Sequence, residues 1–231
     1  MIFLVKERGL VYNNISILLR MEINMKKGII FDMDGTLWDS TEIVAKSWTD
    51  AVRQCGMSDK TITSDDMRKV MGLTMDRIAM ALFPEIEGEE QMKLLDYCCE
   101  VENEYIIKFG GVLYPDLEET WNKLLDMGYK LYIVSNCQSG YIEAFLEHYG
   151  FAHYFEDIEC FGNNGLKKGD NIRSIVERNN LEEAYYVGDI QGDYDATMEA
   201  GIEFIHAAYG FGKINAETKK ISEFKELVEV V

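Results

Sequence analysis

Short apolar runs recur along the chain, and each ends in polar residues or glycine. The runs lie at 28–31, 130–134, 184–187 and 203–206, with a weaker one at 157–161. Runs that are apolar on both faces are typical of strands buried inside a parallel sheet. Helical patterns separate them, at 117–127, 140–149, 171–179 and 193–199. This alternation predicts an α/β fold with a Rossmann-like, doubly wound parallel sheet whose two faces are covered by helices.

The stretch 41–111 breaks this alternation, because it shows helical patterns and no strand-like run. Apolar residues from Ile43 to Val52 recur at helical spacing, and later helices are predicted to begin near Ser64, Thr74 and Glu89. So long a stretch is not an ordinary loop of a compact domain. We therefore predict an all-helical domain, residues 41–111, inserted into a core made of residues 25–40 and 112–231.

Residues 1–24 differ from the rest of the chain and are predicted to lie outside this fold. Charged residues interrupt their apolar runs, and neither run approaches the roughly 20 residues that a membrane span needs. No small-residue cleavage site follows, which disfavours a secretory signal. We favour an over-extended start, with translation beginning at Met25, and a short amphipathic anchor is the alternative.

The charge of the chain narrows the classes of partner. Its 231 residues carry 41 acidic and 23 basic side chains, a formal net charge of −18. Such a surface repels nucleic acids and anionic membranes, so we expect neither as a partner. Hydrophobic residues make up 47% of the chain, which excludes a disordered acidic tail. We expect a globular protein that is a monomer or a homodimer.

The cysteines indicate the compartment. There are five, an odd number, and none forms a CxxC pair. Free thiols in a reducing compartment are the better interpretation, so we expect a cytoplasmic protein, and a zinc site is disfavoured.

Two carboxylates follow the first predicted strand. Asp32 and Asp34 are two residues apart, and their side chains point the same way if the strand extends that far. Carboxylates without nearby histidine or cysteine suit Mg²⁺, and Gly35 allows the chain to turn sharply beside a ligand. The alternative is an acidic turn before the next helix. Taken alone, the two interpretations are evenly matched.

Other polar residues follow the other predicted strands. Ser135 and Asn136 end the second strand, and Asp189 follows the fourth, with Asp193 four residues later. Lys167 and Lys168 lie in the loop between them. The carboxyl ends of parallel strands meet at one edge of a sheet, where ligands bind. We therefore expect these side chains to converge on Asp32 and Asp34.

With these residues in place, the sequence resembles the haloacid dehalogenase superfamily. Asp-x-Asp-Gly-Thr at 32–36 and Gly-Asp-x-x-x-Asp at 188–193 carry the resemblance, which extends from about Met25 to the C-terminus. The similar branch has a helical cap after the first strand and includes phosphoglycolate phosphatases and β-phosphoglucomutases. The resemblance implies a Mg²⁺-dependent phosphatase that acts on a small phosphorylated metabolite, similar to phosphoglycolate or a sugar phosphate.

The resemblance also assigns catalytic and metal-binding roles. Asp32 would be the nucleophile that becomes an aspartyl-phosphate, and Asp34 the general acid and base. Mg²⁺ would be held by Asp32, the backbone carbonyl of Asp34 and Asp189. Asp193 would contact the metal ligands without binding the metal itself, or would contact the metal through a water molecule.

Three further groups would bind the phosphoryl oxygens: the Ser135 side chain, the Asn136 backbone amide and one lysine. We choose Lys168 over Lys167, because Lys168 better fits the lysine that precedes a helix in the family. The sequence Lys-Lys-Gly-Asp departs here from the Lys-Pro-x-Pro of many relatives.

Some residues of the stretch 41–111 and of the C-terminal part remain open. Arg53, Arg68, Lys69 and Arg77 are candidates to contact a second anionic group, although surface charge is the favoured interpretation of each. The loop 210–212, Gly-Phe-Gly, resembles a loop of phosphoglycolate-phosphatase-like members, and a flexible turn is its alternative.

Other functions are weighed against the phosphatase. A β-phosphoglucomutase-like phosphomutase uses the same two aspartates, but we find no convincing pair of cations for a second phosphate. Dehalogenase chemistry is disfavoured, because it needs neither a metal nor Asp34. A non-catalytic module that signals through a phosphorylated aspartate has no inserted helical domain, so the stretch 41–111 argues against it.

Overall fold

A six-stranded parallel sheet forms the centre of the molecule. The computed structural model describes residues 25–231, so the prediction for residues 1–24 concerns a part of the chain outside the described residues. The strands are β1 (Lys27–Phe31), β4 (Tyr129–Ser135), β5 (Phe155–Cys160), β6 (Glu183–Gly188), β7 (Glu203–Ala207) and β8 (Lys219–Ile221). Their order in the sheet is β5-β4-β1-β6-β7-β8, and all neighbours are parallel. The predicted parallel sheet is confirmed.

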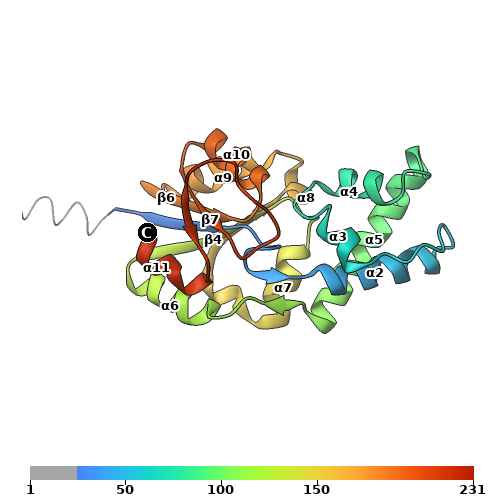
Figure 1. Ribbon diagram of the computed structural model, residues 1–231, viewed down its shortest axis with the longest axis horizontal. Coiled ribbons are helices and arrows are strands. Elements are labelled where there is room, and N and C mark those ends of the chain that lie inside the picture. The colour runs from blue at the N-terminus through green and yellow to red at the C-terminus, as the bar shows by residue number, and fades with distance from the viewer. Residues whose placement is uncertain (1–24) are drawn as a thin grey trace, which may run out of the picture.

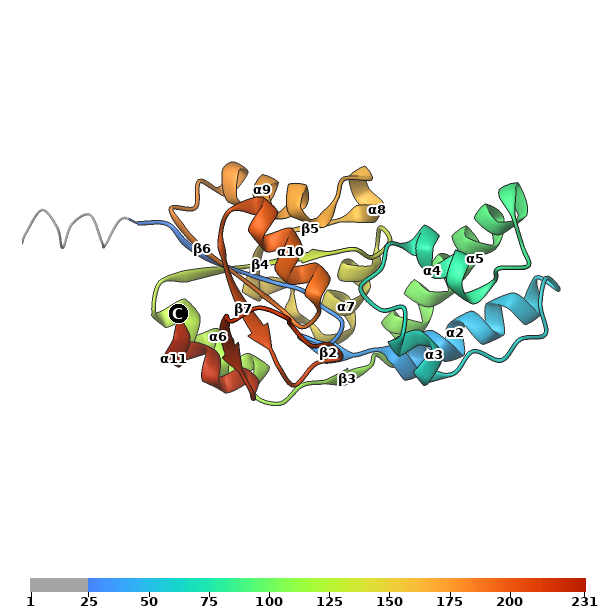
Figure 2. The same ribbon diagram turned by 45° about the horizontal axis from the view of Figure 1, so that its top comes forward.

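Helices cover both faces of this sheet, as Figures 1 and 2 show. Helices α6 (Leu117–Asp126), α7 (Tyr141–Tyr149) and α11 (Leu227–Val230) lie on one face, and α9 (Lys168–Asn179) and α10 (Gln191–Ala200) lie on the other. The strands feed both layers, because successive side chains point to opposite faces. Ile29 and Phe31 pack into the first layer and Ile30 into the second. The apolar run of β1 is therefore buried on both sides.

Three strands and several short helices carry no signal in the sequence. The edge strand β8 has two exposed lysines among its three residues, so it lacks an apolar run. Strands β2 (Trp38–Asp39) and β3 (Val112–Leu113) have two residues each, too few to show a period. The short helices are η1 (Phe151–Tyr154), α8 (Phe161–Asn164) and η2 (Phe224–Glu226).

Four helices lie between β2 and β3, and these two strands pair antiparallel. The helices are α2 (Thr41–Gln54), α3 (Ser64–Arg68), α4 (Met75–Leu82) and α5 (Gly88–Phe109). Figures 1 and 2 show them together at one end of the molecule, with the sheet at the other. We call residues 41–111 the helical insertion. The β2–β3 pair brings the two chain segments that enter and leave it side by side.

The helical insertion contacts loops that follow the sheet strands. Asn136, directly after β4, donates a hydrogen bond from Nδ2 to the carbonyl oxygen of Gly72 at 2.9 Å. Asn103 of α5 donates from Nδ2 to the carbonyl oxygen of Ser139 at 3.0 Å. These contacts hold the insertion over the carboxyl end of β4.

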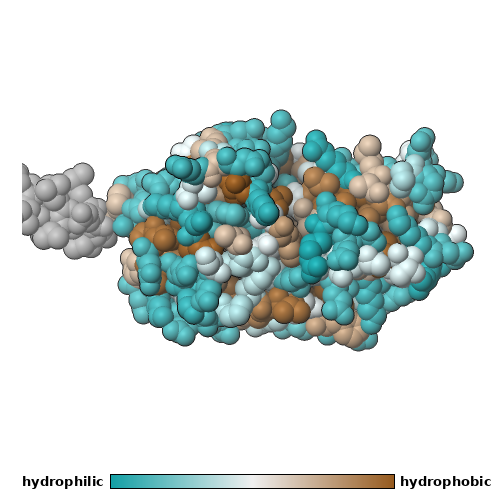
Figure 3. Space-filling model, in the orientation of Figure 1, coloured by the Kyte–Doolittle hydropathy of each residue, from teal (hydrophilic) through white to brown (hydrophobic). Residues whose placement is uncertain are grey.

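The surface of the molecule is mostly polar on the face that Figure 3 shows, with smaller hydrophobic patches. Within residues 25–231, every helix is too short or too polar to cross a membrane.

Candidate active site

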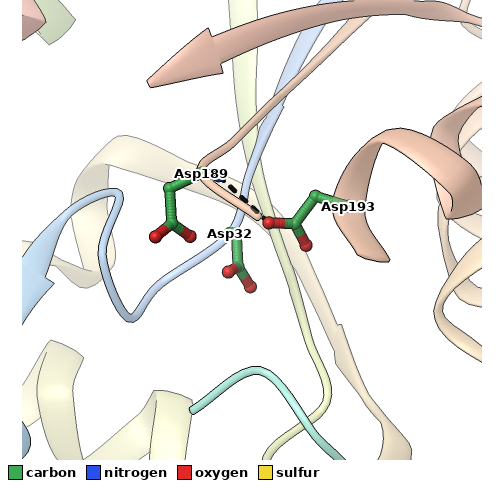
Figure 4. A group of neighbouring side chains, drawn as sticks. All are labelled: Asp32, Asp189 and Asp193. Atoms are coloured by element: carbon green, nitrogen blue, oxygen red, sulfur yellow. Dashed lines mark hydrogen bonds between the residues drawn. The ribbon is translucent and has the colours of Figure 1, made fainter. Parts of the chain in front are cut away.

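Three aspartates meet at the carboxyl edge of the sheet. Asp32 follows β1, Asp189 follows β6, and Asp193 lies in the first turn of α10. Each offers a carboxylate oxygen, and these oxygens lie within 4.8 Å of one another. Figure 4 shows Asp32, Asp189 and Asp193 grouped where the two strands end. Because β1 and β6 are neighbours in register, the residues that follow them emerge side by side.

Lys168 lies between two of these carboxylates. Its Nζ is 2.8 Å from Oδ1 of Asp32 and 2.7 Å from Oδ1 of Asp193. Burial opposes its charge, but Asp193 and Asp32 hold the pKa of Lys168 well above its ordinary value. Lys167, the residue before α9, is exposed. The structure therefore places Lys168, and not Lys167, at the group of aspartates.

Asp32 is almost completely buried, with 2% of its surface exposed. Burial and the neighbouring charge of Asp193 raise the pKa of Asp32 to about 7, although Lys168 acts in the opposite direction. A buried carboxylate that keeps its charge needs compensation beyond one shared lysine. The site is thus electrostatically suited to a further cation.

Asp189 and Asp193 differ in how their oxygens are used. Asp193 accepts hydrogen bonds at Oδ2 from the backbone N–H groups of Asp189 and Ile190, at 3.0 and 3.1 Å. Asp189 accepts one at Oδ2 from the N–H of Phe211 at 2.6 Å, while its buried Oδ1 has no partner among the described residues. Burial, followed by the charges of Asp193 and Asp32, raises the pKa of Asp189 well above its ordinary value. The free oxygen fits a hard cation such as Mg²⁺.

Two glycines let loops close tightly around Asp189. A Cβ atom at Gly35 would lie 2.2 Å from Oδ2 of Asp189, and φ there is +84°. A Cβ atom at Gly210 would lie 2.3 Å from the carbonyl oxygen of Gly35 and 2.4 Å from Cβ of Asp189. Neither position can carry a side chain without movement of the site. The Gly-Phe-Gly loop at 210–212 is therefore part of the site.

Asp34 points to different partners from Asp32. Strand β1 ends at Phe31, so the condition for a shared direction, a strand that extends through both aspartates, is not met. Oδ1 of Asp34 accepts hydrogen bonds from Ser40 Oγ at 2.5 Å and from Tyr141 OH at 2.7 Å. Burial raises the pKa of Asp34 and outweighs these two hydrogen bonds. Neither Ser40 nor Tyr141 belongs to a recognisable motif, so neither was predicted as a site residue.

Ser135 and Asn136 lie at the end of β4, as predicted. Both residues line a pocket that also contains Asp32 and Asp34. Ser135 is buried, with 4% of its surface exposed. The side chain of Asn136 donates its hydrogen bond to Gly72 of the helical insertion. All seven predicted site residues therefore converge on one edge of the sheet.

The pocket continues from this edge into the helical insertion. The lining residues from the insertion include Trp48, Met67, Met75, Ile78 and Glu102, and Gln138 lines the pocket from the core. None of these residues was predicted to line a pocket. Glu102 had no signal, since acidic residues are common along α5.

Comparisons with known proteins agree with this geometry. A family model described as haloacid dehalogenase-like hydrolase matches residues 29–207. The phosphoglycolate phosphatase of Vibrio cholerae is 30% identical over 223 residues, which cover 89% of this chain and 96% of that protein.

Solved structures share the fold. A predicted phosphoglycolate phosphatase from Haemophilus somnus is 22% identical with a TM-score of 0.72, covering 89% of this chain and 97% of that one. CbbY from Rhodobacter sphaeroides in complex with phosphate is 18% identical with a TM-score of 0.75, covering 88% of this chain and 96% of that one. At these identities, the two structures support the fold alone.

Proposed function

Because the chain belongs to the haloacid dehalogenase-like hydrolases, we propose that it is a Mg²⁺-dependent phosphatase that hydrolyses a small phosphorylated metabolite through an aspartyl-phosphate. Family membership confirms the resemblance and the phosphatase class predicted from the sequence. The metal, the intermediate, the residue roles and the substrate belong to the proposal. The convergence of Asp32, Lys168, Asp189 and Asp193 at one edge of the sheet is the observation that carries it.

The proposed reaction has two steps. A carboxylate oxygen of Asp32 bonds to phosphorus while the bond from phosphorus to the alcohol oxygen breaks. Asp34 gives its proton to the departing oxygen, and the raised pKa of this buried carboxyl suits it to hold that proton. Asp34, now ionised, takes a proton from water as the water oxygen attacks phosphorus. Inorganic phosphate leaves and Asp32 is regenerated.

The residues at the site fit Mg²⁺. We assign its ligands to the Asp32 side chain, the backbone carbonyl of Asp34 and the Asp189 side chain. The unpartnered Oδ1 of Asp189 supports this assignment, as does a donor set made only of oxygen. When bound, the ion would offset the negative charges of the phosphate and of Asp32. Asp193 supports the site by fixing the backbone at Asp189 and the ammonium of Lys168.

Ser135, the backbone amide of Asn136 and Lys168 are the proposed ligands of the phosphoryl oxygens. Preorganised donors stabilise the charge that spreads over these oxygens in the transition state. Lys168 is already held in position by Asp32 and Asp193, so it loses little freedom when phosphate binds. The lysine therefore serves both the nucleophile and the phosphate.

We propose that the helical insertion, residues 41–111, is a cap on a core of residues 25–40 and 112–231. Its contact with Asn136 supports this proposal, because a cap at this position would close over the pocket, exclude bulk water and select the substrate. The five cysteines are free in the structure, which supports a cytoplasmic location. We retain a monomer or a homodimer as the expected assembly.

The test compares the wild type with Asp32→Asn and with Asp195→Asn as a matched control. Asp195 lies on α10 and is exposed, so its substitution makes the same chemical change away from the site. With Mg²⁺ and a panel of phosphate monoesters, Asp32→Asn should lose at least 1000-fold in kcat, and the control should keep its activity. Circular dichroism checks that both variants fold. Retained turnover in Asp32→Asn overturns the nucleophile, and activity that survives EDTA overturns the metal.

A further inference from the structure

The part of the pocket wall formed by the helical insertion and Gln138 contains two polar groups that the proposed reaction does not use. Trp48, Met67, Met75 and Ile78 make most of this wall apolar. Glu102 and Gln138 interrupt it. Polar groups placed in an otherwise apolar pocket are the features that orient and select a ligand.

Glu102 is a carboxyl group held inside the pocket wall. It has 3% of its surface exposed, and Trp48 donates a hydrogen bond from Nε1 to its Oε2. Burial raises the pKa of Glu102 to about 8, against the effect of the Trp48 hydrogen bond, and the charge of Asp34 adds to the rise. The site therefore resists any additional negative charge near Glu102.

Gln138 presents a hydrogen-bond acceptor. Its Nε2 donates to Oδ1 of Asn103 at 3.0 Å, and Nδ2 of Asn103 donates to the carbonyl oxygen of Ser139 at 3.0 Å. These two hydrogen bonds distinguish the nitrogen of the Gln138 side-chain amide from its oxygen, because Oδ1 of Asn103 can only accept a hydrogen bond. The remaining atom, Oε1, is buried and has no partner in residues 25–231, while Gln138 as a whole is 7% exposed. A buried acceptor without a partner is costly, so a donor from a ligand would be favourable.

The pocket offers nothing to balance a second anion. In the part of the chain that the structure describes, no lysine or arginine lines it. Arg68 instead pairs with Asp39 at 2.9 Å, and Lys69 pairs with Asp66. Burial already raises the pKa of Glu102 to about 8, which shows that a negative charge is unfavourable here, and an anionic group on the alcohol part of a substrate would likewise lose hydration without gaining a cation.

We propose that this pocket selects a phosphate monoester whose alcohol part carries a hydrogen-bond donor and no negative charge, received by Glu102 and Gln138. The inference rests on the proposed phosphatase function and narrows its substrate class. Hydroxyl and ammonium groups have the required chemistry. A carboxylate, as in phosphoglycolate, and a second phosphate, as in a bisphosphate, do not.

The test uses four phosphate monoesters with the same two-carbon skeleton. They are 2-hydroxyethyl phosphate, 2-aminoethyl phosphate, ethyl phosphate and 2-phosphoglycolate, measured as kcat/KM with Mg²⁺. We expect the better of the first two to exceed both others at least ten-fold, because a site built to bind a donor rejects analogues that lack it. Preference for the hydroxyl identifies a polyol-like alcohol and preference for the ammonium an amino alcohol. Equal or better hydrolysis of ethyl phosphate or 2-phosphoglycolate overturns the inference.

Two variants test the role of Glu102. Glu102→Gln keeps the size of the side chain and an acceptor for Trp48 but removes the ionisable group. At pH 9, where Glu102 is ionised in the wild type, we expect the ratio of kcat/KM for 2-phosphoglycolate to that for ethyl phosphate to rise at least five-fold in this variant. Glu104→Gln, an exposed residue on the same helix, should leave the ratio unchanged. An unchanged ratio in Glu102→Gln overturns the assignment of Glu102.

A binding measurement separates this inference from the proposed function. The four monoesters are titrated with Mg²⁺ into Asp32→Asn, where tryptophan fluorescence reports on the pocket through Trp48. Hydrolysis of p-nitrophenyl phosphate by the wild type tests phosphatase activity itself. If that hydrolysis is absent, the proposed function fails, while the order of the four dissociation constants still supports or overturns the selection by the pocket.

Discussion

The burial of Glu102 predicts a pH-dependent gain in stability when this residue is replaced by glutamine. In the folded protein, burial raises the pKa of Glu102 from 4.5 to about 8. Below pH 4.5, both the folded and the unfolded state carry the proton. Between pH 4.5 and 8, the unfolded state loses it and the folded state keeps it, so the wild type loses stability as the pH rises. Above pH 8 both states are ionised and the loss levels off.

The magnitude follows from the two pKa values. Each unit corresponds to about 1.4 kcal/mol, so the interval from 4.5 to about 8 sets an upper limit of roughly 5 kcal/mol. Relaxation of neighbouring side chains around the ionised group lowers the expected difference to about 2–3 kcal/mol. Glutamine can still accept the hydrogen bond from Trp48. The substitution therefore removes the ionisation with little change in packing.

Urea denaturation at pH 5, 6, 7, 8 and 9 measures this difference. The free energy of unfolding of Glu102→Gln minus that of the wild type should rise from pH 5 to pH 8 and then become constant. The difference between variants isolates Glu102, because all other titrating groups are shared. Glu104→Gln, on the exposed side of α5, should give a flat line. A flat line for Glu102→Gln, or a difference that falls with pH, refutes the reasoning.

Two further predictions concern the site loop and the core. Gly210→Ala should lower kcat at least ten-fold without loss of the fold, because the new Cβ would lie under 2.5 Å from atoms of Gly35 and Asp189. Steady-state kinetics measure kcat and circular dichroism checks the fold. Full activity of the variant would contradict this prediction. Trp121→Ala should lower the free energy of unfolding by about 3–5 kcal/mol, because Trp121 is fully buried against Phe151 and Phe155. Urea denaturation measures this loss, and a change below about 1 kcal/mol would show that the site repacks.

The sheet was predictable because its inner strands are apolar on both faces. Ile29, Ile30 and Phe31 belong to core layers on opposite sides of β1, and this double burial appears in the sequence as an unbroken run. The edge strand β8 was not predictable, since its exposed Lys219 and Lys220 face no core. Its pairing with β7 depends on the sheet already being present.

The group of aspartates was predictable for a related reason. Asp32 and Asp189 directly follow β1 and β6, which lie side by side in the sheet. A residue that follows a predicted parallel strand can therefore be placed at the carboxyl edge of the sheet from its sequence position alone. Tyr141, Glu102 and Gln138 have no such link, because their importance arises only when α7, α5 and the loop after β4 pack together. Glu102 is buried, whereas Glu104, two residues later, is exposed. The sequence does not distinguish these two glutamates, because burial depends on how the helices pack.

The hydrogen bonds to Asp34 come from two segments of the core that are far apart in the sequence. Ser40 lies between β2 and the first residue of α2, whereas Tyr141 begins α7 beneath the sheet. Trp38 of β2 is also bridged to Asp34 through the backbone. The proposed acid therefore joins the segment that leads into the helical insertion to helix α7, and a substitution at Ser40 or Tyr141 would disturb both its proton affinity and this connection.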